Sequence, residues 1–130
     1  MEDRYLFRAK RIDTGEWAEG YLSYPFCTEK GNESYYFYAK DSLGFFCRCV
    51  VDASTICQCT GLVDKNGKLI WENDIVKCGN TTVVVWNEHF ASWCLTKKGW
   101  MYHHFFGESQ ESKDCEVIGN TFDNPELLEV

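Results

Sequence analysis

The chain has 130 residues, which suits one domain or one small domain with an ordered extension. Its formal net charge of −7 argues against a general electrostatic hold on nucleic acid and leaves only a local basic patch open. Aromatic residues make up 16% of the chain, beside two methionines, and this composition favours β-sheet over a helix bundle.

The N-terminus and the cysteines predict a cytoplasmic protein. Met1–Arg8 lacks the long apolar core of a signal peptide, and no run approaches the roughly eighteen apolar residues that a membrane span needs. We therefore expect no membrane contact. The eight cysteines are then expected to be free thiols, because the cytosol is reducing.

In the first half of the chain, alternating large side chains and turn residues predict β-hairpins. Tyr5–Ile12 and Glu16–Leu22 form the first pair of strands, joined by a turn at Asp13–Gly15. Further along we predict a polar loop at Pro25–Ser34, strands at Tyr35–Ala39 and Phe45–Val51, a turn at Asp41–Gly44, and a turn or one short helical turn at Asp52–Thr55.

The stretch Thr60–Val76 has the densest turn signals in the chain. Asn66-Gly67 predicts a hairpin with a type I′ turn, because both residues tolerate positive φ. A second turn is expected at Glu72–Asp74, with Asn73 in the left-handed conformation. The stretch is therefore interpreted as the corner of a small β-barrel.

The last half shows short strands at even spacing, which indicates a small barrel or sandwich. Asn124 and Pro125 predict a short terminal helix through Glu129, as its N-cap and first helical residue. The other predicted elements are strands at Ile75–Cys78, Thr81–Trp86, Phe90–Thr96, Trp100–Phe106 and Cys115–Gly119, turns at Gly79–Asn80 and Lys97–Gly99, and a polar, mobile loop at Gly107–Asp114.

Motifs spread along nearly the whole chain resemble those of the YopX family of phage and prophage proteins. The matching residues, in order, are Phe7-Arg8-Ala9, Gly15-Glu16-Trp17, Val51-Asp52, Thr55, Gln58, Thr60-Gly61-Leu62, Asp64 to Lys68, Trp71 to Val76, Glu116 to Asn120, and Asn124 to Leu128. The chain departs from the pattern at Asn73, where glycine is usual, and at Cys57 and Cys59, where glycine and an aromatic residue are more familiar.

The resemblance implies a small SH3-like barrel in the C-terminal half. Together with the N-terminal β-hairpin extension and the short C-terminal helix that the residues predict, it gives a mainly β fold. The expected division is residues 1–50 as the β-rich extension and residues 51–130 as the YopX-like barrel, the two together forming one compact unit. It further implies a phage or prophage origin, a cytoplasmic place in a bacterial host, and self-assembly into oligomers. It implies no activity, because the family has no established function and a family name is not a mechanism.

Cysteine pairs are the most tempting candidate for a metal site. Cys47 and Cys49, like Cys57 and Cys59, lie two apart on a predicted strand and share a face, so each pair could offer two thiolates to zinc. Structural zinc sites usually separate their cysteines by two to four residues. We therefore favour small, reduced core residues, with zinc as the weaker alternative and a disulfide weaker still.

Other polar residues have similarly plain interpretations. His89, His103 or His104 could pair with a cysteine as a nucleophile and base, but no motif activates such a pair. Glu72 and Asp74 could act as an acid–base pair, yet they flank a tight turn, where an Asp side chain binds backbone N–H groups. The same holds for Asp64 beside Asn66-Gly67. We assign no catalytic, cofactor-binding or metal-binding residue and expect no enzyme activity and no cofactor.

Tryptophans allow two interpretations. They could stack on single-stranded nucleic acid, with Arg8, Lys10, Arg11 or the Lys97-Lys98 turn as basic partners. We favour the alternative that most fill the core and a few make an interface, where Trp is enriched. The tryptophans are Trp17, Trp71, Trp86, Trp93 and Trp100. The predicted function is a non-enzymatic accessory protein that forms homo-oligomers and contacts a host or phage protein, and the alternative is a small-barrel module that binds nucleic acid.

Overall fold

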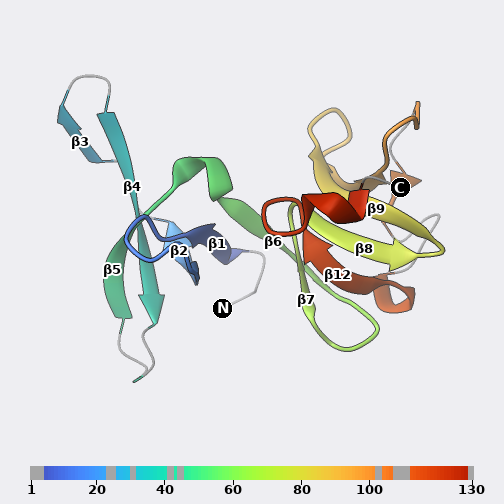
Figure 1. The fold of residues 1–130 in the computed structure, drawn as a ribbon, viewed down its shortest axis with the longest axis horizontal. Coiled ribbons are helices and arrows are strands. Elements are labelled where there is room, and N and C mark those ends of the chain that lie inside the picture. Colours follow the sequence, from blue (N-terminus) through green and yellow to red (C-terminus); the bar gives the residue numbers. More distant parts are fainter. Residues whose placement is uncertain are drawn as a thin grey trace. The chain divides into compact units, whose positions relative to one another are not determined.

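The computed structural model describes residues 5–22, 26–29, 32–40, 43, 46–101, 104–106 and 112–128. These residues are mainly β, with antiparallel strands and short 3-10 turns, as the composition predicts. The chain divides into two compact units, Met1–Cys59 and Thr60–Val130 (Figure 1). Within the described part of the chain, no helix is both long and apolar enough to cross a membrane.

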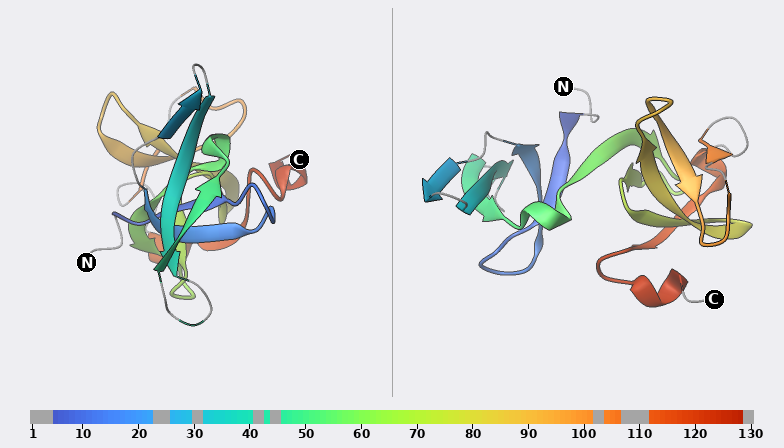
Figure 2. Two further views of the ribbon diagram at one scale, coloured as in Figure 1. Left: turned by 90° about the vertical axis from the view of Figure 1, so that its left-hand side faces the viewer. Right: turned by 90° about the horizontal axis from the view of Figure 1, so that it is seen from above.

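The N-terminal unit is built on hairpins (Figure 2). The predicted first hairpin is confirmed, since Phe7 pairs with Gly20 and Lys10 with Trp17, and Gly15 has a φ of 73° in the turn. The strand order is β3-β4-β2-β1-β6, and β5 also pairs with β4. The strands are β1 (Phe7–Lys10), β2 (Trp17–Leu22), β3 (Phe26–Glu29), β4 (Asn32–Lys40), β5 (Phe46–Val51) and β6 (Cys57–Val63), of which the residues up to Cys59 belong to this unit.

The polar loop predicted at Pro25–Ser34 is wrong. Phe26 pairs with Ser34 and Glu29 with Asn32, with an irregularity between Cys27 and Glu29, so the described residues of this segment are paired strands. Backbone pairing with an extended β4 overrides the polar composition. Of the turn predicted at Asp41–Gly44, only Leu43 lies within the described residues, and its side chain is exposed.

The core of the N-terminal unit is made of small side chains around one large one. Phe37 is fully buried, and the other members are Ala9, Ala18, Ala39, Cys49 and Val51. Small side chains let the strands approach closely. At Gly20, an added Cβ would lie 2.2 Å from the carbonyl oxygen of Tyr38.

Residues after Val51 also belong to this unit. The 3-10 turn η2 (Ala53–Thr55) confirms the short helical turn, with the Asp52 side chain accepting from the Ser54 backbone N–H. The Asp52 N–H donates to the Lys10 carbonyl, and the Lys10 N–H donates to the Thr55 hydroxyl, each at 2.8 Å. These bonds tie η2 to β1, within the first unit.

The C-terminal unit contains a sheet with the order β11-β10-β9-β8-β12, and β7 follows β6 in the other sheet path. Within the described residues this arrangement is not a closed barrel. The elements are β7 (Leu69–Trp71), β8 (Asp74–Cys78), β9 (Asn80–Asn87), β10 (Ser92–Thr96), β11 (His104–Phe105), β12 (Glu116–Asn120) and the 3-10 turns η3 (Ser112–Asp114) and η4 (Pro125–Leu128).

Alternation along β9 and β10 gives this sheet two different faces. Val84 lies opposite Leu95, and both are in the core with Ile70, Val76 and Cys115. The neighbouring pair, Val83 and Thr96, belongs to the other face, where η4 lies near β9.

The turn at Asn66-Gly67 is a hairpin turn, but the type I′ prediction is wrong. Within the described residues, Asn73 and Ala91 are the positive-φ residues other than glycine, so Asn66 does not have the φ that type I′ requires. The Gly67 N–H donates to the Asp64 carbonyl and Gly67 alone has a φ of 78°, as in a type I turn followed by a glycine bulge. In the next turn, Asn73 is left-handed as predicted, with a φ of 69°.

Other boundaries moved for local reasons. The turn predicted at Gly79–Asn80 is shorter than expected. Cys78 pairs with Asn80, so Asn80 belongs to β9 and only Gly79 lies between the two strands. Strand β10 begins at Ser92, after Ala91 with a φ of 49°. Of the strand expected at Trp100–Phe106, the described residues show β11, and residues 102–103 lie outside the described part. In the loop expected at Gly107–Asp114, residues 107–111 are likewise not described and residues 112–114 form η3.

The predicted C-terminal helix is a 3-10 turn, η4, over the described residues. The Asn124 backbone carbonyl accepts from the Leu127 N–H, while the Asn124 side chain accepts from the Asn120 N–H instead of serving as an N-cap within the turn. Asn124 therefore ties η4 back to the end of β12.

Candidate functional site

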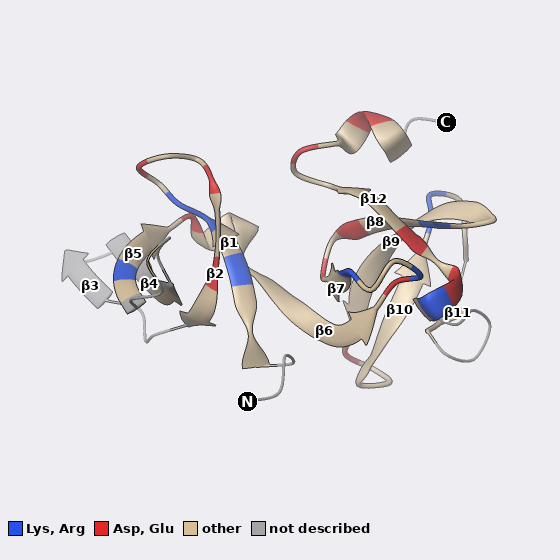
Figure 3. Ribbon diagram, turned by 90° about the horizontal axis from the view of Figure 1, so that it is seen from below, with Lys and Arg blue, Asp and Glu red and all other residues tan. Residues whose placement is uncertain are grey.

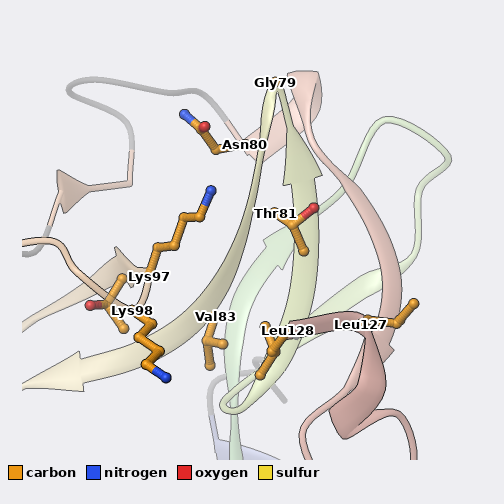
Figure 4. A pocket seen from close by; sticks show the side chains of 9 residues that line it. Gly79, Asn80, Thr81, Val83, Lys97, Lys98, Leu127 and Leu128 are labelled. Atoms are coloured by element: carbon orange, nitrogen blue, oxygen red, sulfur yellow. The ribbon is translucent and has the colours of Figure 1, made fainter. Parts of the chain in front are cut away.

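A pocket of about 490 Å³ opens on the second face of the C-terminal sheet (Figure 4). The β8–β9 turn, strand β9, the end of β10 with the turn that follows it, and η4 supply its walls. The lining residues are Gly79, Asn80, Thr81, Val83, Thr96, Lys97, Lys98, Leu127 and Leu128. Apolar side chains of β9 and η4 therefore meet two cations at one site.

The lysines leave a tight turn. The Trp100 N–H donates to the Lys97 carbonyl at 3.0 Å, and Gly99 has a φ of 93° in the third turn position, as in a type II turn. Lys97 is half-buried and Lys98 is exposed. Figure 4 shows Lys97 extending toward Asn80, whereas Lys98 extends toward the Val83 end of the pocket.

Two aromatic pairs lie at the opposite end of β10, Trp86 with Trp93 and Phe90 with Phe105, and we call these four residues the aromatic patch. Because Phe105 pairs with Cys94, the neighbour of Trp93, the two pairs lie on opposite faces of the sheet. Trp86 packs edge-on against Trp93, its cross-strand partner, with ring centroids 5.1 Å apart. Phe90 packs edge-on against Phe105 at 5.3 Å. Trp86 is 42% exposed and Phe90 59% exposed, so part of this apolar surface faces solvent.

The predicted core role holds for some tryptophans. Trp71 is 3% exposed, and Trp93 packs against the core of the C-terminal unit. Trp86 is exposed, and Trp100 is half-buried with its ring 4.4 Å from that of His104. The aromatic residues are therefore divided between the core and the surface.

Trp17 and the first basic cluster do meet. The Arg8 guanidinium lies 4.7 Å, and the Lys10 ammonium 5.4 Å, from the Trp17 ring centroid. These distances are those of cation–π contacts. Arg11 instead pairs with Asp13 at 2.8 Å, and that contact, through its hydrogen bond first, raises the pKa of Arg11 and lowers that of Asp13.

The candidate zinc-binding cysteines are found in strands and core. Cys49 belongs to the N-terminal core, where burial raises the pKa of its thiol, and Cys47 beside it is half-buried. Cys57 and Cys59 are fully buried in β6, and the Cys57 thiol lies 3.3 Å from the Thr55 carbonyl oxygen. None of the four forms a disulfide bond within the described residues. The described residues contain no group of three or more His, Cys, Asp or Glu arranged to hold a metal ion.

The histidines are surface residues where they are described. His89 is exposed and packs edge-on against Phe90 at 4.7 Å, beside the aromatic patch. His104 is exposed and lies against Trp100. His103 is outside the described residues.

The carboxylates of the two turns bind backbone, as predicted. Asp64 is 2% exposed and accepts from the N–H groups of Asn66, Lys68 and Val117 at 2.9–3.0 Å. Burial alone would raise the pKa of Asp64, but these three hydrogen bonds outweigh it and lower the pKa below its ordinary value. Asp74 is 1% exposed and accepts from the Trp71 N–H at 2.8 Å, whereas Glu72 is half-buried.

Several residues of these surfaces were not found from the sequence. The sequence marks Lys97 and Lys98 as a basic turn but does not mark Asn80, Leu127 and Leu128, because the docking of η4 near β9 joins positions far apart in the chain. Phe90 was placed inside a strand and so was not expected at a surface. The adjacent Leu127-Leu128 pair after Pro125 was the available signal, since an isolated turn cannot bury two leucines on its own.

Comparisons with known proteins support the resemblance seen in the sequence. A search of curated proteins finds no match to this chain. The family described as YopX protein matches residues 6–129, which is nearly the whole chain. The chain belongs to the YopX family.

Proposed function

We propose that this protein is a non-enzymatic, cytoplasmic accessory protein of phage or prophage origin that acts through protein–protein contact, first of all with copies of itself. The observation that carries the proposal is the exposed aromatic patch. Trp86 is 42% exposed and Phe90 is 59% exposed, each packs edge-on against one further ring, and large exposed aromatic side chains are typical of an interface centre.

A second copy is the occupant that suits this patch. Exposed rings from two copies can pack in the edge-to-face geometry that Trp86 and Trp93 already show. Strand β11, which includes Phe105, ends the order of its sheet, so an adjacent backbone edge can contribute. The patch residues are uncharged, which matters because each copy has a net charge of −7.

We further propose that the C-terminal unit is of the SH3-like barrel type. Four strands in a meander, β8 to β11, are followed by the 3-10 turn η3 and by β12, which returns to pair with β8. This order of strands supports an SH3-like arrangement. Such a fold would serve as a scaffold for protein–protein contact, and it does not imply a catalysed reaction.

Multi-angle light scattering over a range of protein concentrations tests self-association. We expect an oligomer in the wild-type protein and a smaller species in Trp86→Ser/Phe90→Ser. Ile12→Ser is the matched control, because Ile12 is 65% exposed in the N-terminal unit, and it should leave the oligomer intact. A monomeric wild type at all concentrations, or an unchanged oligomer in the double variant, would contradict the proposal.

Salt separates this function from nucleic-acid binding, the alternative that the Arg8 and Lys10 contacts with Trp17 favour. Salt screens the repulsion between acidic copies and should strengthen self-association, whereas it weakens binding to phosphates. Figure 3 shows acidic residues spread over the turns of both units. Fluorescence anisotropy with a single-stranded oligonucleotide at low salt tests the alternative. If the protein binds nucleic acid, the wild type should bind the oligonucleotide, and Lys97→Glu/Lys98→Glu or Arg8→Glu should lose that binding.

A further inference from the structure

The pocket beside Lys97 and Lys98 has a wall that is fixed in place. The Asn124 N–H donates to the Asn120 carbonyl at 2.9 Å, and the Asn124 side-chain oxygen accepts from the Asn120 N–H at 3.3 Å. The Asn120 side chain in turn accepts from the N–H groups of Phe122 and Asp123. These bonds hold the start of η4, and with it Leu127 and Leu128, relative to β12.

A glycine lets this wall come close. A Cβ added at Gly119 would lie 2.6 Å from the Asn124 side-chain oxygen, so only glycine permits the observed position of Asn124 without a shift. The pocket is therefore set by a specific arrangement at the end of β12. Pockets that bind small molecules are generally preformed in this way.

The pocket is lined by both apolar side chains and polar or charged ones. Val83, Leu127 and Leu128 supply apolar surface, and Asn80, Thr81 and Thr96 bring polar side chains to the same walls. Lys97 and Lys98 add two adjacent positive charges, in a chain whose net charge is −7. Within the described residues, neither lysine forms an ion pair. The charge of this site is thus opposite to that of the protein as a whole.

We propose that this pocket binds a small amphipathic carboxylate, with its apolar body against Leu127, Leu128 and Val83 and its carboxylate beside the lysines. A volume of about 490 Å³ suits such a ligand. An ammonium group binds a carboxylate by a charge-assisted hydrogen bond, while burial of the apolar body supplies the hydrophobic contribution. Two sources share this chemistry: a free acyl carboxylate and the carboxyl terminus of a peptide that ends in apolar residues. The site is separate from the aromatic patch and does not depend on self-association.

Titration of ¹⁵N-labelled protein with octanoate, followed by NMR, tests the site. We expect the amide signals of Thr81, Leu127 and Leu128 to shift in a saturable way. The affinity should fall at least about tenfold in Lys97→Glu/Lys98→Glu, because the charge-assisted bonds become repulsive. Lys65→Glu/Lys113→Glu is the matched control, since it makes the same change in net charge at two exposed lysines outside the pocket. It should retain binding.

Additional ligands show whether the pocket prefers a free acid or a peptide carboxyl terminus, and what the carboxylate and the apolar body of the ligand each contribute to binding. Octanol lacks the charge and acetate lacks the apolar body, so both should bind at least about tenfold more weakly than octanoate. A tetrapeptide Gly-Gly-Val-Leu with a free carboxyl terminus, compared with its amide, reports whether a peptide is preferred. The proposal is overturned if octanoate and the free peptide both leave these amides unshifted, or if the control variant loses as much affinity as Lys97→Glu/Lys98→Glu.

Discussion

The two units stabilise their strands by different means. In the N-terminal unit the core consists of alanines, Cys49 and Val51 around Phe37, and β2 and β4 lie so close that Gly20 has no room for a side chain. In the C-terminal unit the core side chains are larger, and buried Asp64 and Asp74 bind the backbone at the turns. The stability of the first unit therefore depends most on steric fit between its strands. The stability of the second depends most on hydrogen bonds to its buried carboxylates.

Asp64→Ala should have the largest effect on stability. It removes the acceptor for three N–H groups, those of Asn66, Lys68 and Val117, in a buried place. Each orphaned donor costs about 1–3 kcal/mol, so we expect a loss of about 3 kcal/mol or more in the free energy of unfolding. Urea denaturation measures it, with the exposed Asp114→Ala as the control. A loss as small as that of the control would show that the turn does not depend on its carboxylate.

Gly20→Val should have the next largest effect, and for a different reason. The backbone at Gly20 has no positive φ, but a Cβ there would overlap the Tyr38 carbonyl, so the strands must separate. Overpacking of this kind typically costs about 1–3 kcal/mol. Hydrogen exchange should show faster exchange at the β2–β4 pairs. Unchanged exchange there would contradict the steric account of the N-terminal unit.

Gly67→Val gives the complementary case, with a smaller effect of about 1–2 kcal/mol. An added Cβ meets nothing within 4 Å, so the penalty comes from the φ of 78° alone. Gly67→Asn should recover much of the loss, because asparagine tolerates the left-handed region. Thermal unfolding of the two variants measures the difference. Equal destabilisation by Val and Asn would mean that backbone strain is not the cause.

The pH dependence should be the smallest effect near neutral pH, because it appears only at the acidic and alkaline ends of the pH scale. The lowered pKa of Asp64 stabilises the fold above the ordinary carboxyl value of 3.8, and this contribution is lost as the pH falls. Burial, and then the neighbouring Cys78 thiol, raise the pKa of Cys115 from 9.0 to about 12, so its contribution is lost as the pH rises between these values. Cys115→Ser should therefore flatten the alkaline side of a stability curve measured by urea denaturation. An alkaline limb as steep as that of the wild type would exclude Cys115 as its source.

Local turn chemistry explains most of what the sequence predicted. Gly15, Asn73 and Gly99 each mark a turn that only a few residue types can form, so the hairpins around them could be found. The type of the turn at Asn66-Gly67 could not be predicted from these two residues. The Asp64 side chain accepts hydrogen bonds from the Asn66 and Lys68 N–H groups, and Gly67 alone is in the left-handed region. That choice depends on a side chain outside the dipeptide.

The candidate sites were less predictable because they depend on distant segments. Lys97-Lys98 is visible as a basic turn, yet the pocket exists only because Asn124 ties η4 to the end of β12. Strand β3 was missed in the same way, since its pairing with β4 and not its own composition makes it a strand. Composition likewise does not show that Trp71 is buried and Trp86 exposed.

The bond from the Val117 N–H to Asp64 joins residues 53 positions apart in the chain. A ribosome releases the chain from its N-terminal end, so the N-terminal unit has all its strands once residue 59 has emerged. The C-terminal unit still lacks β12 at that time, and the Asp64 carboxylate lacks one of its three donors until residue 117 emerges. We therefore expect the two units to fold at different times during synthesis, with the turn at Asp64 completed among the last.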